Sequence, residues 1–245
     1  MFGTNVIRHR ENRADGALAV QEIFYTLQGE GPYAGCPAVF IRLAGCNLAC
    51  TFCDTEFESK ASNYMSARDI VIAAQKTCTG LGHAPMVVLT GGEPLRQNCI
   101  PLLGLLASIG VFVQIETAGT LWDHALGDFV INGDLVLVCS PKTVGIKAEL
   151  AKYCNHYKYI ITAGQTSPYD GLPNVGTQAS NAHLEQRLYR PEKRDAHEPK
   201  CVTWVSPCDA HDAKATGANI EEAVRVALRY GYRLSLQMHK LVGLP

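Results

Sequence analysis

Three closely spaced cysteines constrain this chain more than any other feature. Cys46, Cys50 and Cys53 follow the pattern C-x3-C-x2-C, directly after an apolar run, residues 38–45, that predicts a buried strand. Cysteine thiolates are the usual ligands of iron–sulfur clusters. Because a cubane cluster has four irons, three cysteines would leave one iron open to an outside ligand. The spacing therefore predicts a [4Fe–4S] site that does chemistry as well as carrying electrons.

Other interpretations of the cysteines have less support. A fourth cysteine would favour zinc or a closed cluster, but the chain holds no further C-x2-C pair outside this loop. The three thiols could also be unrelated buried side chains. Most of the remaining seven of the ten cysteines are expected to be small buried hydrophobes, and these seven are Cys36, Cys78, Cys99, Cys139, Cys154, Cys201 and Cys208.

Length and composition indicate one globular domain, residues 1–245, with a sizeable core, since 47% of the 245 residues are hydrophobic. The net charge of −1 lacks the basic excess typical of proteins that bind nucleic acid or anionic membranes. The N-terminus has no apolar core of a secretory signal, and no apolar run approaches the roughly 20 residues of a membrane span. We therefore predict a cytoplasmic protein with reduced cysteines and with neither nucleic acid nor membrane as a partner.

Predicted strands alternate with predicted helices, which favours parallel βα units. The expected strands are residues 19–25, 38–45, 86–89, 111–115, 135–139, 159–162, 201–205 and 233–237. Helices are expected after Ser66, over about residues 99–109, and from a cap at Asn219 and Glu222. The inner face of the last helix would comprise Ile220, Ala223, Val224, Ala227 and Leu228.

About six such units are too few for a closed eight-stranded barrel. The predicted fold is therefore an α/β partial, open parallel β/α barrel. Residues 1–17 are expected to be a loose extension or a short edge element. Residues 163–199 have little periodicity and are expected to be a long, variable excursion.

Five polar motifs each follow the C-terminal end of a predicted strand, and in a parallel barrel these ends share one rim where active sites form. They are the cysteine loop, Thr90-Gly-Gly-Glu-Pro94, Glu116-Thr117, Ser140-Pro-Lys142 and Ser206-Pro-Cys-Asp209. A Gly-rich loop, residues 26–35, adds Gln28 and Glu30 on a backbone that allows close ligand approach. Taken singly, the glycines could form a turn, Phe52 could be packing, and Lys142 could be a surface residue. Their common position predicts a site.

The cysteine spacing and the Thr90–Pro94 motif resemble those of radical S-adenosylmethionine (SAM) enzymes. Three further motifs, Leu27-Gln-Gly-Glu-Gly31, Cys53-Asp-Thr55 and Gln237-Met-His-Lys240, together with Arg42, make the chain similar to the 7-carboxy-7-deazaguanine synthases of that superfamily. The similarity is close over about residues 20–142 and looser over the last fifty. It implies a barrel of the radical-SAM type.

The resemblance implies a lyase of the queuosine and archaeosine pathway, which supplies a precursor for tRNA modification. A reduced cluster would cleave SAM to methionine and a 5′-deoxyadenosyl radical, and the radical would take a hydrogen from 6-carboxy-5,6,7,8-tetrahydropterin. Ring contraction and loss of ammonia would give 7-carboxy-7-deazaguanine, with SAM regenerated. The implied cofactors are a [4Fe–4S] cluster, SAM and Mg²⁺. The implied partners are a flavodoxin- or ferredoxin-type reductant and a second copy of the chain in a homodimer.

The same resemblance implies roles for individual residues. The metal ligands would be Cys46, Cys50 and Cys53 on iron and Thr55 on Mg²⁺. The pterin would be bound by Leu27, Gln28, Gly29, Glu30, Arg42, Thr90, His239 and Pro245. SAM would be bound by Phe52, Cys53, Asp54, Gly92, Glu93, Glu116, Ser140, Pro141, Lys142, Ser206, Pro207, Cys208 and Asp209. This chain departs from the family at Ser206, where Gln is expected, and at Met238, where Thr is more usual.

The last residues of the chain are mostly apolar and are expected to pack inward over the pterin. By the resemblance, the carboxylate of Pro245 would accept two parallel hydrogen bonds from the amino group and ring N–H of the pterin. Alternatively, Pro245 merely ends a packed extension of the last strand.

Two other functions remain open from the sequence. A glycyl-radical activating enzyme would share the cysteine spacing and the partial barrel, but it would consume SAM and would have no need for Gln28, Glu30 and Thr55. A non-catalytic iron–sulfur carrier or a zinc-binding module would bind metal without cleaving SAM. That reading leaves the other four rim motifs without a purpose.

Overall fold

The computed structural model describes residues 6–53, 55–58, 63–81, 85–178, 180–182, 184–192 and 200–244. Over these residues, nine strands form one sheet in the order β3-β1-β2-β4-β5-β6-β7-β8-β9. Their bounds are β1 Leu18–Leu27, β2 Pro37–Leu43, β3 Tyr64–Met65, β4 Met86–Gly91, β5 Val113–Thr117, β6 Leu135–Cys139, β7 His156–Ile161, β8 Val202–Pro207 and β9 Arg233–Leu234.

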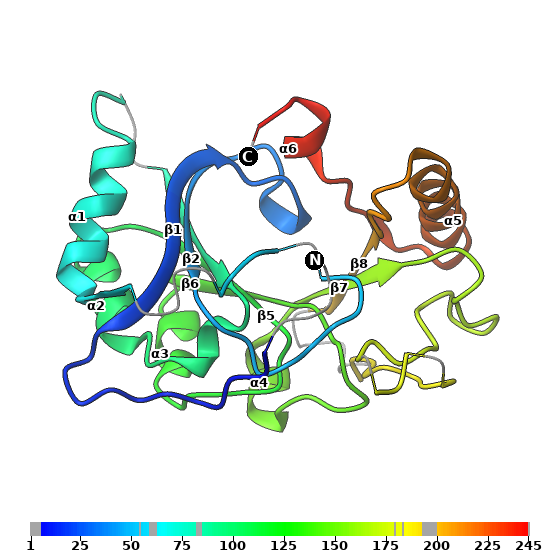
Figure 1. The fold of residues 1–245 in the computed structure, drawn as a ribbon, viewed down its shortest axis with the longest axis horizontal. Coiled ribbons are helices and arrows are strands. Elements are labelled where there is room, and N and C mark those ends of the chain that lie inside the picture. Colours follow the sequence, from blue (N-terminus) through cyan, green and yellow to red (C-terminus); the bar gives the residue numbers. More distant parts are fainter. Residues whose placement is uncertain are drawn as a thin grey trace.

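The sheet from β2 to β9 is parallel throughout, and β1 and β3 add an antiparallel edge beside β2. The sheet curves strongly from β1 round to β8 (Figure 1). It stays open, because the strand order ends at β3 on one side and at β9 on the other. This confirms the predicted open, partial barrel.

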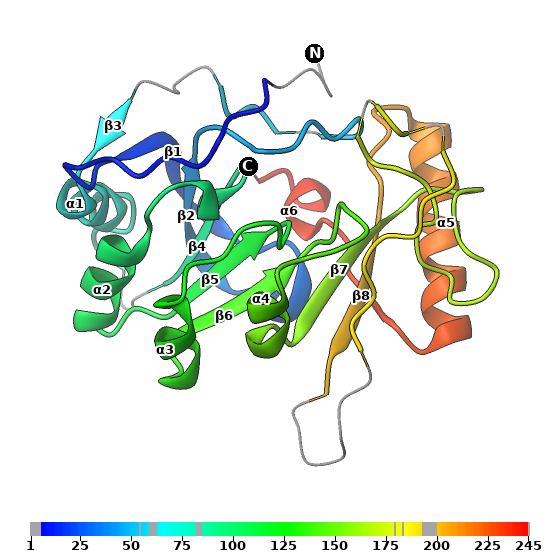
Figure 2. The same ribbon diagram turned by 90° about the horizontal axis from the view of Figure 1, so that it is seen from below.

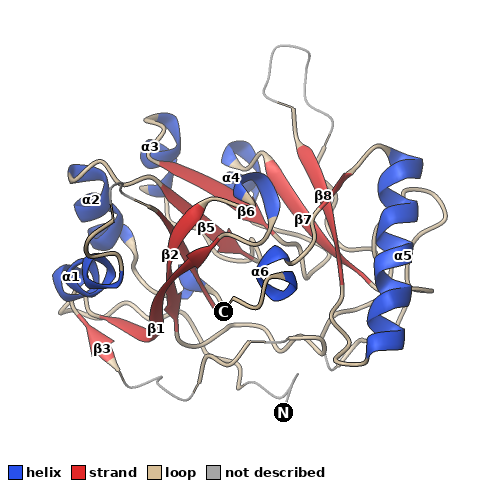
Figure 3. Cartoon of the chain, turned by 90° about the horizontal axis from the view of Figure 1, so that it is seen from above, coloured by secondary structure: helices blue, strands red, loops and turns tan. Residues whose placement is uncertain are grey.

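Five helices lie along the outer side of the curved sheet (Figures 1 and 3). They are α1 Ala67–Thr77, α2 Ile100–Ser108, α3 Leu126–Ile131, α4 Ala148–Tyr153 and α5 Ala213–Tyr230. The short helix α6, Met238–Leu241, lies apart from them and is linked to the loop after β1 by a hydrogen bond from Met238 N to Gly29 O, 3.1 Å. Among the described residues, no helix combines the length and the apolar character needed to cross a membrane.

Local sequence explains several of these elements. The Ser66 side chain caps α1 by accepting a hydrogen bond from Asp69 N, as the sequence predicted. Ile70 on α1 is fully buried, and so are the α2 residues Leu102 and Leu103 in the same core. Full burial of each such side chain contributes about 1.5–3 kcal/mol. The apolar faces of the outer helices therefore hold them against the sheet.

The predicted start of the last helix, at Asn219, is wrong. α5 begins after Asp212, whose side chain accepts a hydrogen bond from Ala215 N at 2.8 Å. Asn219 lies inside α5, where its side chain donates to Cys208 O and accepts from Ala163 N, both at 2.9 Å. Asn219 and Glu222 match the spacing of a capping box, but tertiary contacts use their side chains instead.

The predicted inner face of α5 is only partly right. Ala223 and Ala227 are buried as expected, and Val226 joins them, whereas Ile220 is 37% exposed and Leu228 is 82% exposed. The buried face of α5 instead consists of Asn219, Ala223, Val226 and Ala227, and the side chain of Asn219 makes its two hydrogen bonds on this face. The last strand is also shorter than predicted, since β9 ends at Leu234 and residues 238–241 form α6.

The N-terminal segment is attached to the rim. Ile7 forms a parallel bridge with Cys46, and Arg8 N donates to Cys46 O at 2.7 Å. Glu11 N donates to Arg96 O at 2.8 Å. The N-terminal segment therefore passes beside the loop that follows β2 at Ile7 and Arg8 and then runs on toward β1 (Figure 2). The sequence had indicated a loose extension or a short edge element here.

Candidate active site

A cavity of about 510 Å³ opens at the C-terminal ends of the parallel strands. All five polar motifs contribute to its wall, which confirms that they share one rim. The loop after β1 and helix α6 add further residues. This volume lies in the range of sites that enclose a small molecule.

The three cysteines of the loop after β2 all line this cavity as free thiols. Leu48 N donates to Cys46 Sγ at 3.4 Å, and the Gln178 side chain donates to Cys50 Sγ at 3.2 Å. Burial raises the pKa of the Cys46 thiol to about 12. A thiolate at this position therefore needs a metal to stabilise its charge.

Within the described ranges, no three His, Cys, Asp or Glu side chains are placed to hold a single metal ion. A cubane cluster is different, because its protein ligands bind separate irons and stand farther apart. Three free thiols on one loop, facing one cavity, fit such a cluster.

The two glycines of the Thr90–Pro94 motif bring the end of β4 against the cysteine loop. A Cβ atom on Gly91 would overlap the carbonyl oxygen of Leu43, and one on Gly92 would overlap that of Gly45. Gly91 also has a φ of +147°, which disfavours a side chain. Close backbone packing therefore requires glycine at both positions. The expected contact of Gly92 with SAM remains a prediction.

Glu93, expected at SAM, lies behind the cavity wall. Its carboxylate is fully buried and accepts hydrogen bonds from Leu95 N at 3.1 Å, Thr117 Oγ1 at 2.8 Å and Ala118 N at 2.8 Å. Burial raises the pKa of this carboxyl group, although the hydrogen bonds oppose the shift. Glu93 therefore joins the end of β4 to the end of β5.

Glu116 connects three elements within the cavity. Its carboxylate accepts hydrogen bonds from Gln28 Nε2 at 3.1 Å, Thr90 Oγ1 at 3.2 Å and Gln114 Nε2 at 3.1 Å. Gln28 and Thr90 were expected to bind the pterin and Glu116 to bind SAM. The structure places all three in one hydrogen-bonded group.

Two lysines lie on the opposite wall. Lys158 on β7 is only 8% exposed and forms an ion pair with Glu30. Ser140 Oγ donates to Lys158 O at 2.8 Å and accepts from Lys142 Nζ at 2.6 Å. Lys142 Nζ also lies 5.2 Å from the ring centroid of Phe52, and burial lowers its pKa. Lys158 was not predicted, although a lone lysine within an apolar strand is a signal that could have identified it.

Arg42 and Thr55 face the cavity from β2 and the cysteine loop. Arg42 Nε donates to Glu22 Oε1 at 2.6 Å, and its terminal NH1 lies 3.5 Å from Thr55 Oγ1. At the other end of the site, a Cβ atom on Gly29 would overlap the imidazole of His239. Gly29 therefore allows α6 to approach the loop after β1.

Some of the remaining predicted site residues line the cavity, and others lie beside it or are buried. Leu27, Pro207, Cys208 and Asp209 line the cavity. Pro141 lines a smaller cavity of about 100 Å³ next to Phe52 and Lys142. Ser206 is fully buried, and its Oγ has no hydrogen-bond partner among the described residues. Asp54 and Pro245 lie outside the described residues, so their roles stay predictions.

The expectation that the last residues pack inward is wrong for those that the structure describes. Leu241 is 71% exposed, Val242 is 60% exposed and Leu244 is 40% exposed. The chain turns through α6 and closes with a hydrogen bond from Leu244 N to His239 O at 2.8 Å. These three apolar side chains are not among the described residues that line the cavity.

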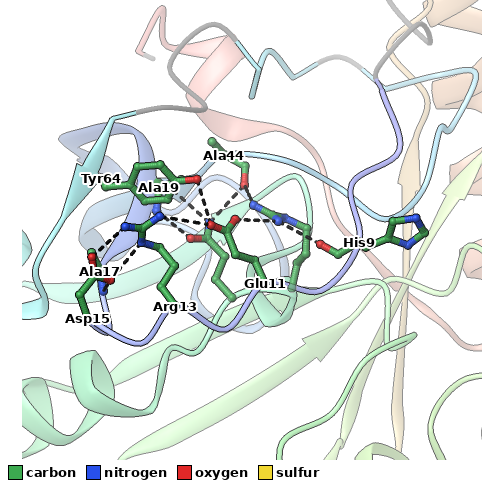
Figure 4. A network of polar contacts seen from close by, with 10 residues as sticks. His9, Glu11, Arg13, Asp15, Ala17, Ala19, Ala44 and Tyr64 are labelled. Carbon is green, nitrogen blue, oxygen red and sulfur yellow. Dashed lines mark hydrogen bonds and ion pairs between the residues drawn. The ribbon is translucent and has the colours of Figure 1, made fainter.

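Sequence reasoning also missed a polar network behind the cysteine loop. Arg96 is 5% exposed, and its guanidinium donates to His9 O at 3.0 Å, Glu11 Oε2 at 3.1 Å and Ala44 O at 3.1 Å (Figure 4). The Gln97 amide donates to Ala44 O at 3.2 Å. These contacts fix the backbone just before Cys46. An arginine two positions after the Thr90–Pro94 motif was the only signal in the sequence.

Comparisons with known proteins agree with this geometry. A family model described as the Radical SAM superfamily matches residues 40–168. A 7-carboxy-7-deazaguanine synthase from Rhodospirillum rubrum is 42% identical over 247 residues, which cover 99% of both chains. One from Rickettsia prowazekii is 36% identical, over 100% of this chain and 96% of that protein. The crystal structure of QueE from Escherichia coli has a similar fold, with a TM-score of 0.63 and 24% identity over 91% of this chain and 95% of that one. This chain therefore belongs to the 7-carboxy-7-deazaguanine synthase family of the radical SAM superfamily.

Proposed function

We propose that this chain is a carbon–nitrogen lyase that converts 6-carboxy-5,6,7,8-tetrahydropterin to 7-carboxy-7-deazaguanine with loss of ammonia. One observation carries the proposal. A single cavity joins the three thiols of the cysteine loop to the side chains proposed to hold the pterin, which are Gln28, Glu30, Arg42, Thr90 and His239. The family membership of the chain supports the same activity.

In this proposal Cys46, Cys50 and Cys53 hold a [4Fe–4S] cluster, and SAM binds beside it. When bound, the cluster and SAM together supply one-electron chemistry that abstracts a hydrogen from the substrate. Phe52, Ser140, Lys142 and Asp209 would contact SAM, since the family resemblance assigns them to it and all four line the cavity that holds the three thiols. The reductant, the homodimer and the cytoplasmic location stay predictions.

The charges of the cavity wall suit a carboxylated pterin. The amino group and ring N–H of a pterin are hydrogen-bond donors, and the carboxylates of Glu30 and Glu116 are acceptors that face the cavity. The substrate carboxylate needs a cationic partner, and Arg42, which also pairs with Glu22, supplies one that lines the same cavity. The hydrogen bonds from Gln28 and Thr90 hold Glu116 in place before substrate arrives.

Thr55 is the proposed ligand of Mg²⁺. Its hydroxyl oxygen is a hard ligand beside Arg42, so a metal there could share the substrate carboxylate with the guanidinium. We expect Thr55→Ala to lower turnover and to weaken its dependence on Mg²⁺, with iron content unchanged. Thr55→Ser keeps the hydroxyl and should keep the Mg²⁺ response. Identical Mg²⁺ titrations for wild type and Thr55→Ala would place the metal elsewhere.

The activity itself is tested by anaerobic reconstitution with iron and sulfide, followed by assay with 6-carboxy-5,6,7,8-tetrahydropterin, SAM, a reductant and Mg²⁺. We expect 7-carboxy-7-deazaguanine to form while SAM is recovered unchanged. Stoichiometric consumption of SAM without this product would overturn the proposal in favour of a glycyl-radical activating enzyme. Iron binding without any SAM cleavage would favour a non-catalytic iron–sulfur protein.

A further inference from the structure

Part of the long excursion reaches the cysteine loop. Cys50 and Gln178 form an antiparallel bridge, although 128 positions separate them in the chain. Thr51 N donates to Thr177 O at 2.9 Å, and Ala49 N donates to Gln178 Oε1 at 2.7 Å. Thr177 and Gln178 thus contact the residues on both sides of Cys50.

The orientation of the Gln178 amide follows from its partners. A backbone N–H can only donate, so the group that faces Ala49 N must be the amide oxygen. The amide nitrogen then faces Cys50 Sγ at 3.2 Å and Thr177 Oγ1 at 2.8 Å. Thr177 Oγ1 donates its own hydrogen to Lys142 O at 2.7 Å, which leaves a lone pair free to accept from the amide. One N–H of Gln178 is therefore directed at the cysteine sulfur.

Hydrogen bonds to Asn181 hold Gln178 in this position. Gln178 N donates to Asn181 Oδ1 at 3.0 Å, and Asn181 N donates to Gln178 O at 2.9 Å. A Cβ atom on Gly176 would overlap Asn181, so the chain needs glycine there to close the turn. Thr177 is 4% exposed. The amide thus extends from a residue whose own backbone N–H and C=O are both hydrogen-bonded to Asn181.

A hydrogen bond to a cysteine sulfur has a specific effect on an iron–sulfur cluster. Reduction adds negative charge, some of which lies on the ligand sulfurs, and an N–H donor stabilises that charge. The cluster is then easier to reduce. The hydrogen bond to Cys46 Sγ comes from the backbone of Leu48, whereas the one to Cys50 Sγ comes from a side chain that can be replaced.

We propose that Gln178 is a positioning residue that orients Cys50 and raises the reduction potential of the cluster through its N–H···S hydrogen bond. The proposal rests on the proposed function in one respect, namely that the cysteine loop holds the cluster. It gives the excursion a role in the site that the motifs on the rim do not reveal.

The test compares variants by redox titration of the reconstituted protein without SAM, followed by electron paramagnetic resonance (EPR). Gln178→Glu keeps an oxygen for Ala49 N but removes the N–H donor and adds a negative charge. We expect its equilibrium constant for one-electron reduction to fall about tenfold, which is a potential lower by about 59 mV. Gln178→Met removes the donor without adding charge, so its reduction potential should lie between those of Gln178→Glu and wild type.

The matched control is Gln75→Glu, which adds the same charge at an exposed position of α1, on the outer side of the sheet. It should keep the wild-type potential. Equal potentials for wild type, Gln178→Glu and Gln178→Met at equal iron content would overturn the proposal and leave the proposed function intact. The same would follow if both variants lost iron without a change in the potential of the cluster that remained. Failure of wild type to take up a cluster would instead overturn the proposed function.

Discussion

Two segments that are far apart in the sequence hold the cysteine loop, and they do so with different chemistry. On one side, Ile7 and Arg8 of the N-terminal segment, residues 6–13, contact the backbone of Cys46, with Arg8 N donating to Cys46 O at 2.7 Å. The buried guanidinium of Arg96 supports that segment from behind. On the other side, the neutral amide of Gln178 reaches the sulfur of Cys50 itself.

The difference separates placement from tuning. The Arg96 network ends at main-chain oxygens and a carboxylate, so its loss should displace the loop without directly changing the charge felt by a sulfur. The Gln178 amide donates to the sulfur of Cys50, so its loss should change the reduction potential of the cluster more than the stability of the fold. Variants on the two sides should therefore differ in what they change, namely stability on one side and reduction potential on the other.

The largest effect should come from removing the Cys50 thiol, to which Gln178 donates a hydrogen bond. We expect Cys50→Ala to lose the visible absorbance of the cluster and all SAM cleavage, because three thiolates are the minimum set in this loop. Cys36→Ala is the control, since Cys36 is a half-buried free thiol at the opposite end of β2. Full SAM cleavage by Cys50→Ala would remove the reason for treating the loop as a cluster site.

A large loss of stability is expected on the N-terminal side. Arg96→Met leaves His9 O and Glu11 without their buried donor, and we expect it to lower the free energy of unfolding by about 3 kcal/mol. Urea denaturation of the apo-protein measures this. Arg13→Met removes a more exposed arginine, 36% of whose side chain is accessible, from the edge of the same network and should change little. Equal stability of the two variants would contradict a placing role for Arg96.

A smaller effect, on stability at low pH, is expected where Thr166 of the excursion is bonded to Glu222 of α5. Thr166 Oγ1 donates to Glu222 Oε1 at 2.6 Å, and the hydrogen bond from Arg225 holds the pKa of Glu222 at about 2. Because this folded-state pKa is depressed, the stability that Glu222 contributes is present above its ordinary pKa of 4.5 and is lost as pH falls toward 2.

Wild type should therefore exceed Glu222→Gln in denaturation midpoint at pH 6, and the gap should close as the pH falls toward 2. The stability that ionised Asp170 contributes should depend on pH in the same direction. Burial raises the pKa of Asp170, but its hydrogen bonds, above all the one from Arg190, outweigh burial and lower the pKa. A difference in denaturation midpoint that stays constant with pH would show that ionised Glu222 does not stabilise this contact between the excursion and α5.

The rim could be predicted from sequence because each motif follows its own apolar strand. Leu135–Cys139, for example, forms β6 with the bounds that its apolar run indicated, and Ser140 and Lys142 follow at the cavity. Nearby residues along the chain decide such strand ends, so local patterns suffice.

The two segments that hold the cysteine loop could not be predicted, because their contacts join distant residues that show no periodicity. Gln178 lies 128 positions from Cys50, and Arg96 lies 87 from His9. The requirement for glycine at position 92 could not be predicted from the sequence either, since it depends on the close approach of the Gly45 backbone. Asn219 misled because a capping-box spacing also occurs where tertiary hydrogen bonds use the same side chains.

The open iron of the cluster is the central claim, and EPR of the reduced protein tests it most directly. Protein reconstituted anaerobically should give the signal of a reduced [4Fe–4S] cluster, and SAM should shift that signal because the iron without a cysteine ligand can bind it. Gln178→Glu should show the same shift on addition of SAM, since its effect is on potential and not on the vacancy. A cluster signal that SAM leaves unchanged, in wild type at saturating SAM, would contradict the claim.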